Sequence, residues 1–325
     1  MKLARIILAV GAIGVALVPF TGATFYIQLV TKIMILAIFA MSLDLLVGCA
    51  GLVSLGHATF FGVAGYMLAL LSPKYQAASI WLTLPAVLTI SAALALLIGV
   101  LVLRTSGVYF IMVTLAFGQM LYYLFHDTKL GGGSDGIYLY FKPELRIAGA
   151  KLLDLEKPFQ FFYFVFGIML AVYFLLSRVF ASPFGHALAG LRVNQQRMRS
   201  LGFPPMAYKL GAFVLAGTLA GLAGYLSACQ FGFVNPEILS WHYSATVLMM
   251  LILGGVGRLY GAILGAFAYV LLQELMSSQA LLGTVAKHWQ LGMGAVIVLI
   301  VLLLPSGLGG IFDSLARIRI AQPGG

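Results

Sequence analysis

Long runs of apolar residues, separated by short polar stretches, cover most of the chain. They lack the alternation of strands, and most approach the ~20 residues that a helix needs to cross a bilayer core. Lipid offers no partner to the exposed backbone of an open sheet, so helices are the expected spanning elements. The candidate spans are residues 5–20, 24–47, 53–72, 80–103, 107–126, 159–180, 209–230, 241–254, 259–276 and 288–304. This pattern predicts an all-α polytopic bundle of about ten spans (eight at the fewest), forming one transmembrane domain over residues 1–325. The short ranges 53–72 and 241–254 suggest broken or re-entrant helices.

The composition supports a membrane protein and excludes a soluble one. Of the 325 residues, 62% are hydrophobic and only 9% are charged, whereas a soluble domain carries about 25% charged residues. The net charge of +10 would fit a nucleic-acid-binding protein. The basic residues, however, lie between the apolar runs, where they set the orientation in the membrane. We therefore expect the protein to lie in a lipid bilayer and to bind no nucleic acid.

The distribution of lysine and arginine predicts that both termini lie in the cytoplasm. With the N-terminus inside, the basic residues assigned to the inner side are Lys2, Arg5, Arg104, Arg178, Arg192, Arg197, Arg199, Lys209, Arg258, Arg317 and Arg319. Only Asp313 opposes them there. The outer side receives Lys74, Lys129, Lys142, Arg146, Lys151, Lys157 and Lys287, balanced by acidic residues.

The first apolar run also has features of a signal peptide. Lys2 and Arg5 precede it, and Thr21-Gly22-Ala23 could serve as a cleavage site. Because many spans follow, we favour an uncleaved first helix.

Two long connections separate the spans. The outer one, about 127–158, is charged and rich in glycine. The inner one contains Ser182-Pro183, a typical helix start, and ends with Gly202 and Pro204-Pro205, a typical helix stop. Between them the apolar residues at helical spacing are Phe184, Ala187, Leu188, Leu191, Met198 and Leu201. We expect one amphipathic helix over 183–201, in a segment 182–203. It could rest on lipid headgroups or dock into a groove of a cytoplasmic partner.

Small and polar residues inside the spans give the remaining candidates. Glycines at helix-packing spacing are Gly217, Gly221, Gly257, Gly261 and Gly265. Gln28, Thr31 and Lys32 share one face of a helix and form a candidate pathway, although Lys32 could instead extend outward to the headgroups. Asp44, near the inner end of the same span, is a further candidate pathway residue, although it could also reach headgroups. His57 either bonds local backbone at a helix break or belongs to a gate.

A set of short motifs resembles one transporter family. The motifs are SLDLLVG at 42–48, GLVSLGHA at 51–58, FG at 61–62, RTSGVYF at 104–110, TLAF at 114–117, GGSDGI at 132–137 and LGGVG at 253–257. In this order, over residues 30–313, they resemble the branched-chain amino acid ABC permeases of the LivM type. Each motif alone would carry little weight.

The resemblance extends to the family's cytoplasmic docking motif. Gly185, Ala187, Arg192, Asn194, Leu201 and Gly202 match it, and Leu188 and Leu191 complete the apolar face of the coupling segment. The chain departs from the motif at His186, Gln195 and Met198, where a basic residue, an acidic residue and alanine are usual. The resemblance favours docking over a lipid-bound helix.

The family implies a subunit that works only in an assembly. The expected partners are a second, related permease, two cytoplasmic ATPases and a periplasmic solute-binding protein, and the expected location is the bacterial inner membrane. The expected substrates are leucine, isoleucine and valine, with urea, short amides or aromatic acids as the alternative. ATP would bind to the partners, in agreement with the absence of a Gly-x-x-x-x-Gly-Lys-Ser/Thr phosphate-binding loop from the sequence. We predict no catalytic residue, no metal and no cofactor.

Two other classes of protein fit less well. A membrane-embedded enzyme would need clustered catalytic groups, and none of the histidines shows the His-Glu-x-x-His spacing of a zinc site. A secondary transporter would place coupling residues near the bilayer midplane. Only Lys32 approaches that depth, and the coupling segment would remain unexplained.

Overall fold

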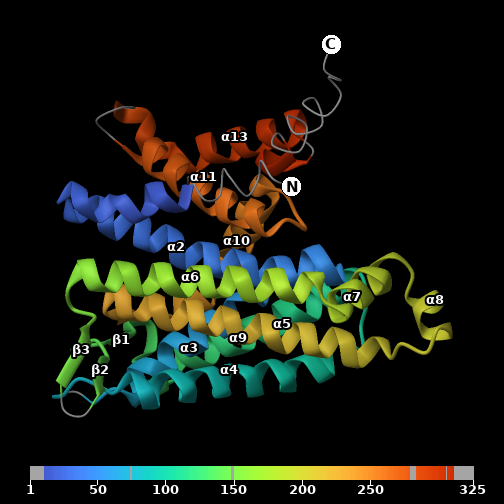
Figure 1. Cartoon of the computed structure of the whole chain (residues 1–325), viewed down its shortest axis with the longest axis horizontal. Coiled ribbons are helices and arrows are strands. Elements are labelled where there is room, and N and C mark those ends of the chain that lie inside the picture. Colours follow the sequence, from blue (N-terminus) through green and yellow to red (C-terminus); the bar gives the residue numbers. More distant parts are fainter. Residues whose placement is uncertain (1–10, 74, 148–149, 279–282, 305, 311–325) are drawn as a thin grey trace.

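The computed structural model describes residues 11–73, 75–147, 150–278, 283–304 and 306–310. Long helices lie along the longest axis, with the strands at one end and α7 and α8 at the other (Figure 1). The helices are α2 (Thr24–Asp44), α3 (Ala58–Leu71), α4 (Ile80–Val102), α5 (Val108–Asp127), α6 (Pro158–Ala181), α7 (Pro183–Val193), α8 (Gln195–Ser200), α9 (Pro205–Phe231), α10 (Trp241–Gly254), α11 (Leu259–Ser277) and α13 (Trp289–Leu303). A π-helical turn, η2 (Leu45–Ala50), continues α2. Short 3-10 turns are η1 (Val18–Thr21), η3 (Lys129–Gly131), η4 (Gly133–Asp135), η5 (Pro236–Leu239) and η6 (Gly283–His288).

The helices confirm the all-α membrane bundle. In the described part of the chain, seven helices are long and apolar enough to cross a membrane, and three apolar helices are shorter, namely Gly11–Phe20, α3 and α10. The ten predicted ranges thus contain helices, but length and composition support a complete crossing for seven. The orientation of the termini stays a prediction, and residues 1–10 and 311–325 lie outside the described residues.

The long polar connection between α5 and α6 is more ordered than a simple loop. It contains β1 (Ile137–Tyr138), β2 (Glu144–Ile147) and β3 (Ala150–Asp154). Strands β2 and β3 form an antiparallel hairpin. β1 pairs with β4 (Phe233–Val234), which follows α9, so that Ile137 lies opposite Val234. The connection is thereby fastened to a segment about a hundred residues further along the chain.

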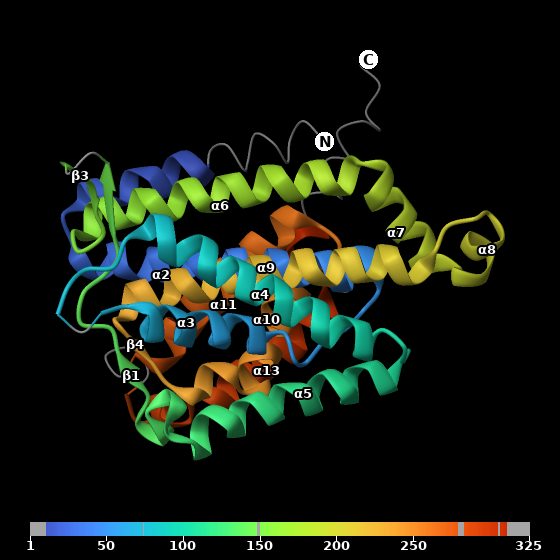
Figure 2. The same cartoon turned by 90° about the horizontal axis from the view of Figure 1, so that it is seen from below.

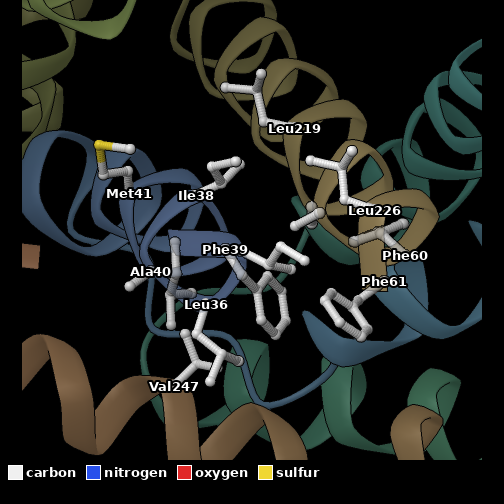
Figure 3. Close-up of a cluster of buried hydrophobic side chains, with 14 of the residues drawn as sticks. Leu36, Ile38, Phe39, Ala40, Met41, Phe60, Phe61, Leu219, Leu226 and Val247 are labelled. Carbon is white, nitrogen blue, oxygen red and sulfur yellow. The ribbon is translucent and has the colours of Figure 1, made fainter. Parts of the chain in front are cut away.

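Helix α2 occupies the centre of the bundle. Along it every residue from Ile33 to Asp44 is buried, and its neighbours are α6, α9, α10 and α11. The central cluster combines Leu36 and Phe39 of α2 with residues of three other helices (Figure 3). Those residues are Phe60 and Phe61 of α3, Leu219 and Leu226 of α9, and Val247 of α10.

Glycines permit the closest approaches between helices. A Cβ atom on Gly217 or Gly221 of α9 would lie 2.6 Å from the Cβ of Ala95 or Ser91, respectively, on α4. On α11, a Cβ atom on Gly261 would lie 2.7 Å from the carbonyl oxygen of Gly254, and one on Gly265 would lie 2.8 Å from its amide nitrogen. Gly257 differs from the expected stripe. It lies in the turn before α11 with a φ of +82°, so it serves the turn and not a helix face.

Candidate functional site

Two half-length helices begin inside the bundle and meet there. Helices α3 and α10 have 14 residues each, which corresponds to about 21 Å, whereas the bilayer core is about 30 Å thick. Helix α3 covers only part of the length of its neighbour α9 (Figure 2). The amide of Ala58, in the first turn of α3, donates a 2.8 Å hydrogen bond to Oγ of Ser244, in the first turn of α10. The sequence predicted short or broken helices here, but it gave no sign that the two N-termini would be joined.

His57 lies at this junction and bonds across elements. It is fully buried, and its Nε2 lies 2.9 Å from Oγ of Ser42 on α2. Its ring stacks on Phe39 with centroids 5.4 Å apart, and its Nδ1 has no hydrogen-bond partner among the described residues. The interpretation that His57 bonds local backbone is therefore wrong, because its partner belongs to another helix. A buried polar atom without a partner costs about 1–3 kcal/mol, and Nδ1 of His57 bears that cost in this arrangement.

The candidate pathway residues nearer the N-terminal end of α2 have different surroundings. Thr31 is buried, and its hydroxyl donates to the carbonyl oxygen of Ile27 at 2.6 Å. Lys32 is half-buried and Gln28 is exposed. The backbone carbonyl of Gln28 accepts a 2.8 Å bond from Nε2 of Gln230 on α9. The three side chains thus range from the bundle interior to its surface.

Asp44 is not at the headgroups. It is fully buried at the end of α2, and its Oδ1 accepts a 2.7 Å hydrogen bond from the amide of Gly257. The interpretation that it reaches the membrane surface is therefore wrong. The sequence indicates only how far along the helix Asp44 lies. The structure shows in addition that the turn between α10 and α11 packs over it and buries it.

The coupling segment forms two helices instead of one. Oγ of Ser182 accepts a 3.3 Å bond from the amide of Gly185, as expected for a cap, and Gly202 ends the segment with a φ of +88°. At Asn194 the backbone becomes extended, and its side chain caps α8 by accepting a 2.9 Å bond from the amide of Arg197. The single helix predicted over 183–201 is therefore wrong at this residue.

The predicted coupling residues divide into two groups. Gly185, Ala187, Leu188 and Leu191 are buried, so they fix α7 to the rest of the chain, where it packs on α6, α9 and η2. The exposed residues are Arg192, Asn194, Leu201 and Gly202. Exposed arginines 197 and 199 on α8 add positive charge. The segment thus offers a basic surface at the end opposite to the strands (Figure 1).

A cavity of about 240 Å³ opens beside this segment. It lies between α7, the turn from α4 to α5 and the loop after η2, and its polar lining includes Arg192, Gln195 and Lys209. Nζ of Lys209 donates a 2.7 Å bond to Oε1 of Gln195, which joins α8 to α9. Sequence reasoning used Lys209 only for orientation, because its partner lies 14 residues away on a separate helix.

One motif could be mistaken for a hydrolase elbow. Residues 132–136 read Gly-Gly-Ser-Asp-Gly, which fits Gly-x-Ser-x-Gly. Ser134 is, however, exposed in the turn η4, and its hydroxyl lies 3.3 Å from Oδ1 of Asp135. The motif requires a turn between a strand and a helix, with a histidine near the serine. This segment contains the turn η4 and lies between the turn η3 and the two-residue strand β1, so its geometry does not favour a nucleophile.

Long apolar helices packed around the buried helix α2 define a multi-pass α-helical membrane protein. The family model described as "Branched-chain amino acid transport system / permease component" matches residues 25–304. The chain belongs to this family of ABC transporter permeases and is a multi-pass protein of the inner membrane.

Curated relatives agree with this assignment. The chain is 33% identical to the "High-affinity branched-chain amino acid transport system permease protein LivM" of Escherichia coli, over 89% of this chain and 71% of the relative. The protein of the same name from Salmonella typhimurium is 31% identical, with the same coverage. The "Autoinducer 2 import system permease protein LsrC" of Photorhabdus laumondii is 28% identical over 58% of this chain and 48% of the relative. No solved structure matches the chain.

Proposed function

We propose that this chain is the membrane-spanning permease subunit of an ABC importer for branched-chain amino acids. A periplasmic binding protein delivers leucine, isoleucine or valine, and two partner ATPases drive the gating. The observation that carries the proposal is the pair α7 and α8. It has a capped start, a buried apolar face and an exposed basic face at one end of the bundle. A partner that moves can transmit force through such a segment.

The substrate proposal rests on the relatives and on the chemistry of the interior. Two relatives are named for branched-chain amino acid transport and cover most of this chain. The central cluster is apolar and aromatic, which suits an aliphatic side chain. The autoinducer relative shows that the family also carries other ligands, so the binding protein has to be tested together with the permease.

Reconstitution tests the whole assembly. The permease, its related partner permease and both ATPases are placed in proteoliposomes, and the purified binding protein is added outside with radiolabelled leucine. We expect uptake that requires internal ATP and the binding protein, and that excess isoleucine or valine inhibits. If only urea, a short amide or an aromatic acid inhibited uptake, that compound and not a branched-chain amino acid would be the substrate. Uptake that an ion gradient drives while the ATPases are inactive would show that the protein is a secondary transporter.

Within the permease, we propose that the junction of α3 and α10 closes the pathway. His57, Ser42 and Phe39 fill this point, and the unpartnered Nδ1 of His57 is a polar group that an open pathway would expose. In His57→Gln we expect uptake to fall at least about tenfold, which corresponds to about 1.4 kcal/mol in the barrier. The exposed His242, on α10, gives the matched control His242→Gln. Equal uptake in both variants would contradict the assignment.

Gln28, Thr31 and Lys32 form the proposed outer part of the pathway. Half-buried Lys32 is the informative member, because a charge inside the membrane costs about 2.5–3.5 kcal/mol on insertion scales. Replacing it with methionine removes the charge and keeps an unbranched chain. Unchanged uptake in Lys32→Met at normal expression would remove these residues from the pathway.

A further inference from the structure

The carboxylate of Asp44 is only half satisfied where it is buried. Its Oδ1 accepts the bond from the amide of Gly257, whereas its Oδ2 has no hydrogen-bond partner among the described residues. A buried carboxylate is costly unless it is paired, and an open lone pair on it requires an explanation. The Oδ2 atom of Asp44 can therefore accept a further hydrogen bond.

A candidate donor belongs to the coupling segment. Arg192, in the last turn of α7, lays its side chain across Gly51, where a Cβ atom would lie 2.8 Å from the Cγ of Arg192. Its Nη1 donates to the carbonyl oxygen of Gly48. Gly48 lies one helical turn after Asp44, and a Cβ atom on it would lie 2.5 Å from Oδ1 of Asp44. The guanidinium thus bonds to a neutral carbonyl one helical turn from the carboxylate, and among the described residues it forms no ion pair with Asp44.

A third segment meets the other two at Gly48. A Cβ atom on Gly48 would lie 2.7 Å from the Cα of Gly257, so the two backbones are in contact. Gly257 belongs to the turn that links α10 to α11, and α10 reaches through Ser244 to the start of α3. The inner end of α2, the coupling helix α7 and the half-length helix α10 therefore share one contact point.

The backbone at this point is suited to rearrangement. Residues Leu45–Ala50 form a π-helical turn that ends at Gly51 in the left-handed region. Such wide turns occur frequently at functional sites. A small shift of η2 or α7 would exchange the Gly48 carbonyl for the carboxylate as the acceptor of the guanidinium.

We infer that Asp44 is a positioning residue for energy coupling, and that its open carboxylate oxygen binds Arg192 in another state of the transport cycle. The exchange links a movement of the coupling segment to the turn between α10 and α11. A paired charge replaces an unpaired one, so the second state gains stability when α7 moves. This inference rests on the proposed function, because it assumes that partner ATPases move α7.

The test measures coupling in the complete transporter, as uptake per ATP hydrolysed in proteoliposomes with the binding protein. Asp44→Asn retains an acceptor for the Gly257 amide and removes the charge, and Arg192→Gln removes the charge of the donor. We expect each variant to lower the uptake per ATP hydrolysed at least about tenfold. The double variant should be no worse than either single variant, because both changes remove one interaction.

Arg197→Gln is the matched control, since Arg197 is an exposed arginine of the neighbouring helix α8. In the double variant of Asp44→Asn and Arg197→Gln, the fold-losses of uptake per ATP should multiply, because the two residues do not share an interaction. If Asp44→Asn fails to fold, Arg192→Gln on the exposed segment still reports the pair, and normal coupling in it would overturn the inference. Effects of Asp44→Asn and Arg192→Gln that multiply would also overturn it. A wild-type complex without ATP-dependent uptake would instead overturn the proposed function.

Discussion

Helices α2 and α5 are both long and apolar, yet they occupy opposite environments. In their most apolar windows, 94% of the residues of α2 and its continuation are buried within the protein, compared with 22% for α5. Helix α13 is among the most apolar helices, and only 12% of its window is buried. Hydropathy therefore does not separate the centre of the bundle from its lipid-facing rim. Lipid is as apolar as leucine, so the hydrophobic effect does not sort these helices.

Small and polar side chains distinguish the centre. Thr31, Ser42 and Asp44 are buried on α2, and three glycines of α9 face neighbouring helices. Such residues allow close approach and interhelical hydrogen bonds, which hold helices together in a membrane. Three pairs of matched substitutions, one in the centre and one on the rim, test this difference, and a fourth pair lies in the coupling segment. They follow from the largest expected effect to the smallest.

The largest effect is expected at Gly224 on α9. A Cβ atom there would lie 2.9 Å from the Cα of Phe61 and closer still to its carbonyl group, so backbone would have to move. Overpacking typically costs about 1–3 kcal/mol, and a clash with backbone exceeds this range because no side-chain rotation can relieve it and the two helices have to separate. We expect Gly224→Leu to abolish the monodisperse peak in size-exclusion chromatography in detergent. Gly167→Leu on α6, where no atom lies within 4 Å of the new Cβ, should keep that peak. Equal peaks would contradict the packing of α3 on α9.

The second effect concerns the aromatic centre. Phe39 is fully buried, with its ring centroid 4.7 Å from that of Phe61. Truncation of such a residue to alanine costs about 3–5 kcal/mol, because a cavity remains. Phe174→Ala on α6 removes the same atoms from a side chain that is 63% exposed. Thermal unfolding in detergent should give a Tm for Phe39→Ala that lies well below that of Phe174→Ala. Similar Tm values would show that α2 is not the centre.

The third effect concerns the bond between the half-length helices. Ser244→Ala removes the acceptor of the Ala58 amide, which leaves a buried donor unpaired at a cost of about 1–3 kcal/mol. Ser177→Ala on α6 removes a hydroxyl that bonds only to the Phe174 carbonyl of its own helix. Hydrogen exchange should show faster exchange in the first turn of α3 for Ser244→Ala alone. An unchanged rate there would argue against the junction.

Sequence reasoning succeeded where the signals are local. Apolar runs located the helices, and Ser182 with Pro183 located the start of α7. It failed where a residue depends on a distant partner. Asp44 and Gly257 are 213 residues apart, and Ala58 and Ser244 are 186 residues apart. No spacing along the chain indicates such pairs. The same limit explains why headgroup contact was the simplest interpretation of Asp44.

The smallest effect is expected at Asn194. Its role as a helix cap is a local signal, but the helical spacing of the apolar residues around it hid this signal. Leu191 and Met198 are seven residues apart and fit one continuous helix, yet asparagine is also a strong helix cap. Its Oδ1 accepts the bond from the Arg197 amide, and loss of a cap costs about 1 kcal/mol. Asn194→Ala should therefore speed hydrogen exchange in α8 several-fold while the Tm of the bundle stays the same. Gln196→Ala, at an exposed position two residues further along in α8, should change neither. Slower exchange in Asn194→Ala would mean that α7 and α8 had merged into one helix, so that the break exists only because asparagine caps it. A fall in uptake with that merger would show that the transporter needs the break, as expected if the basic surface of α8 must move separately from the buried face of α7.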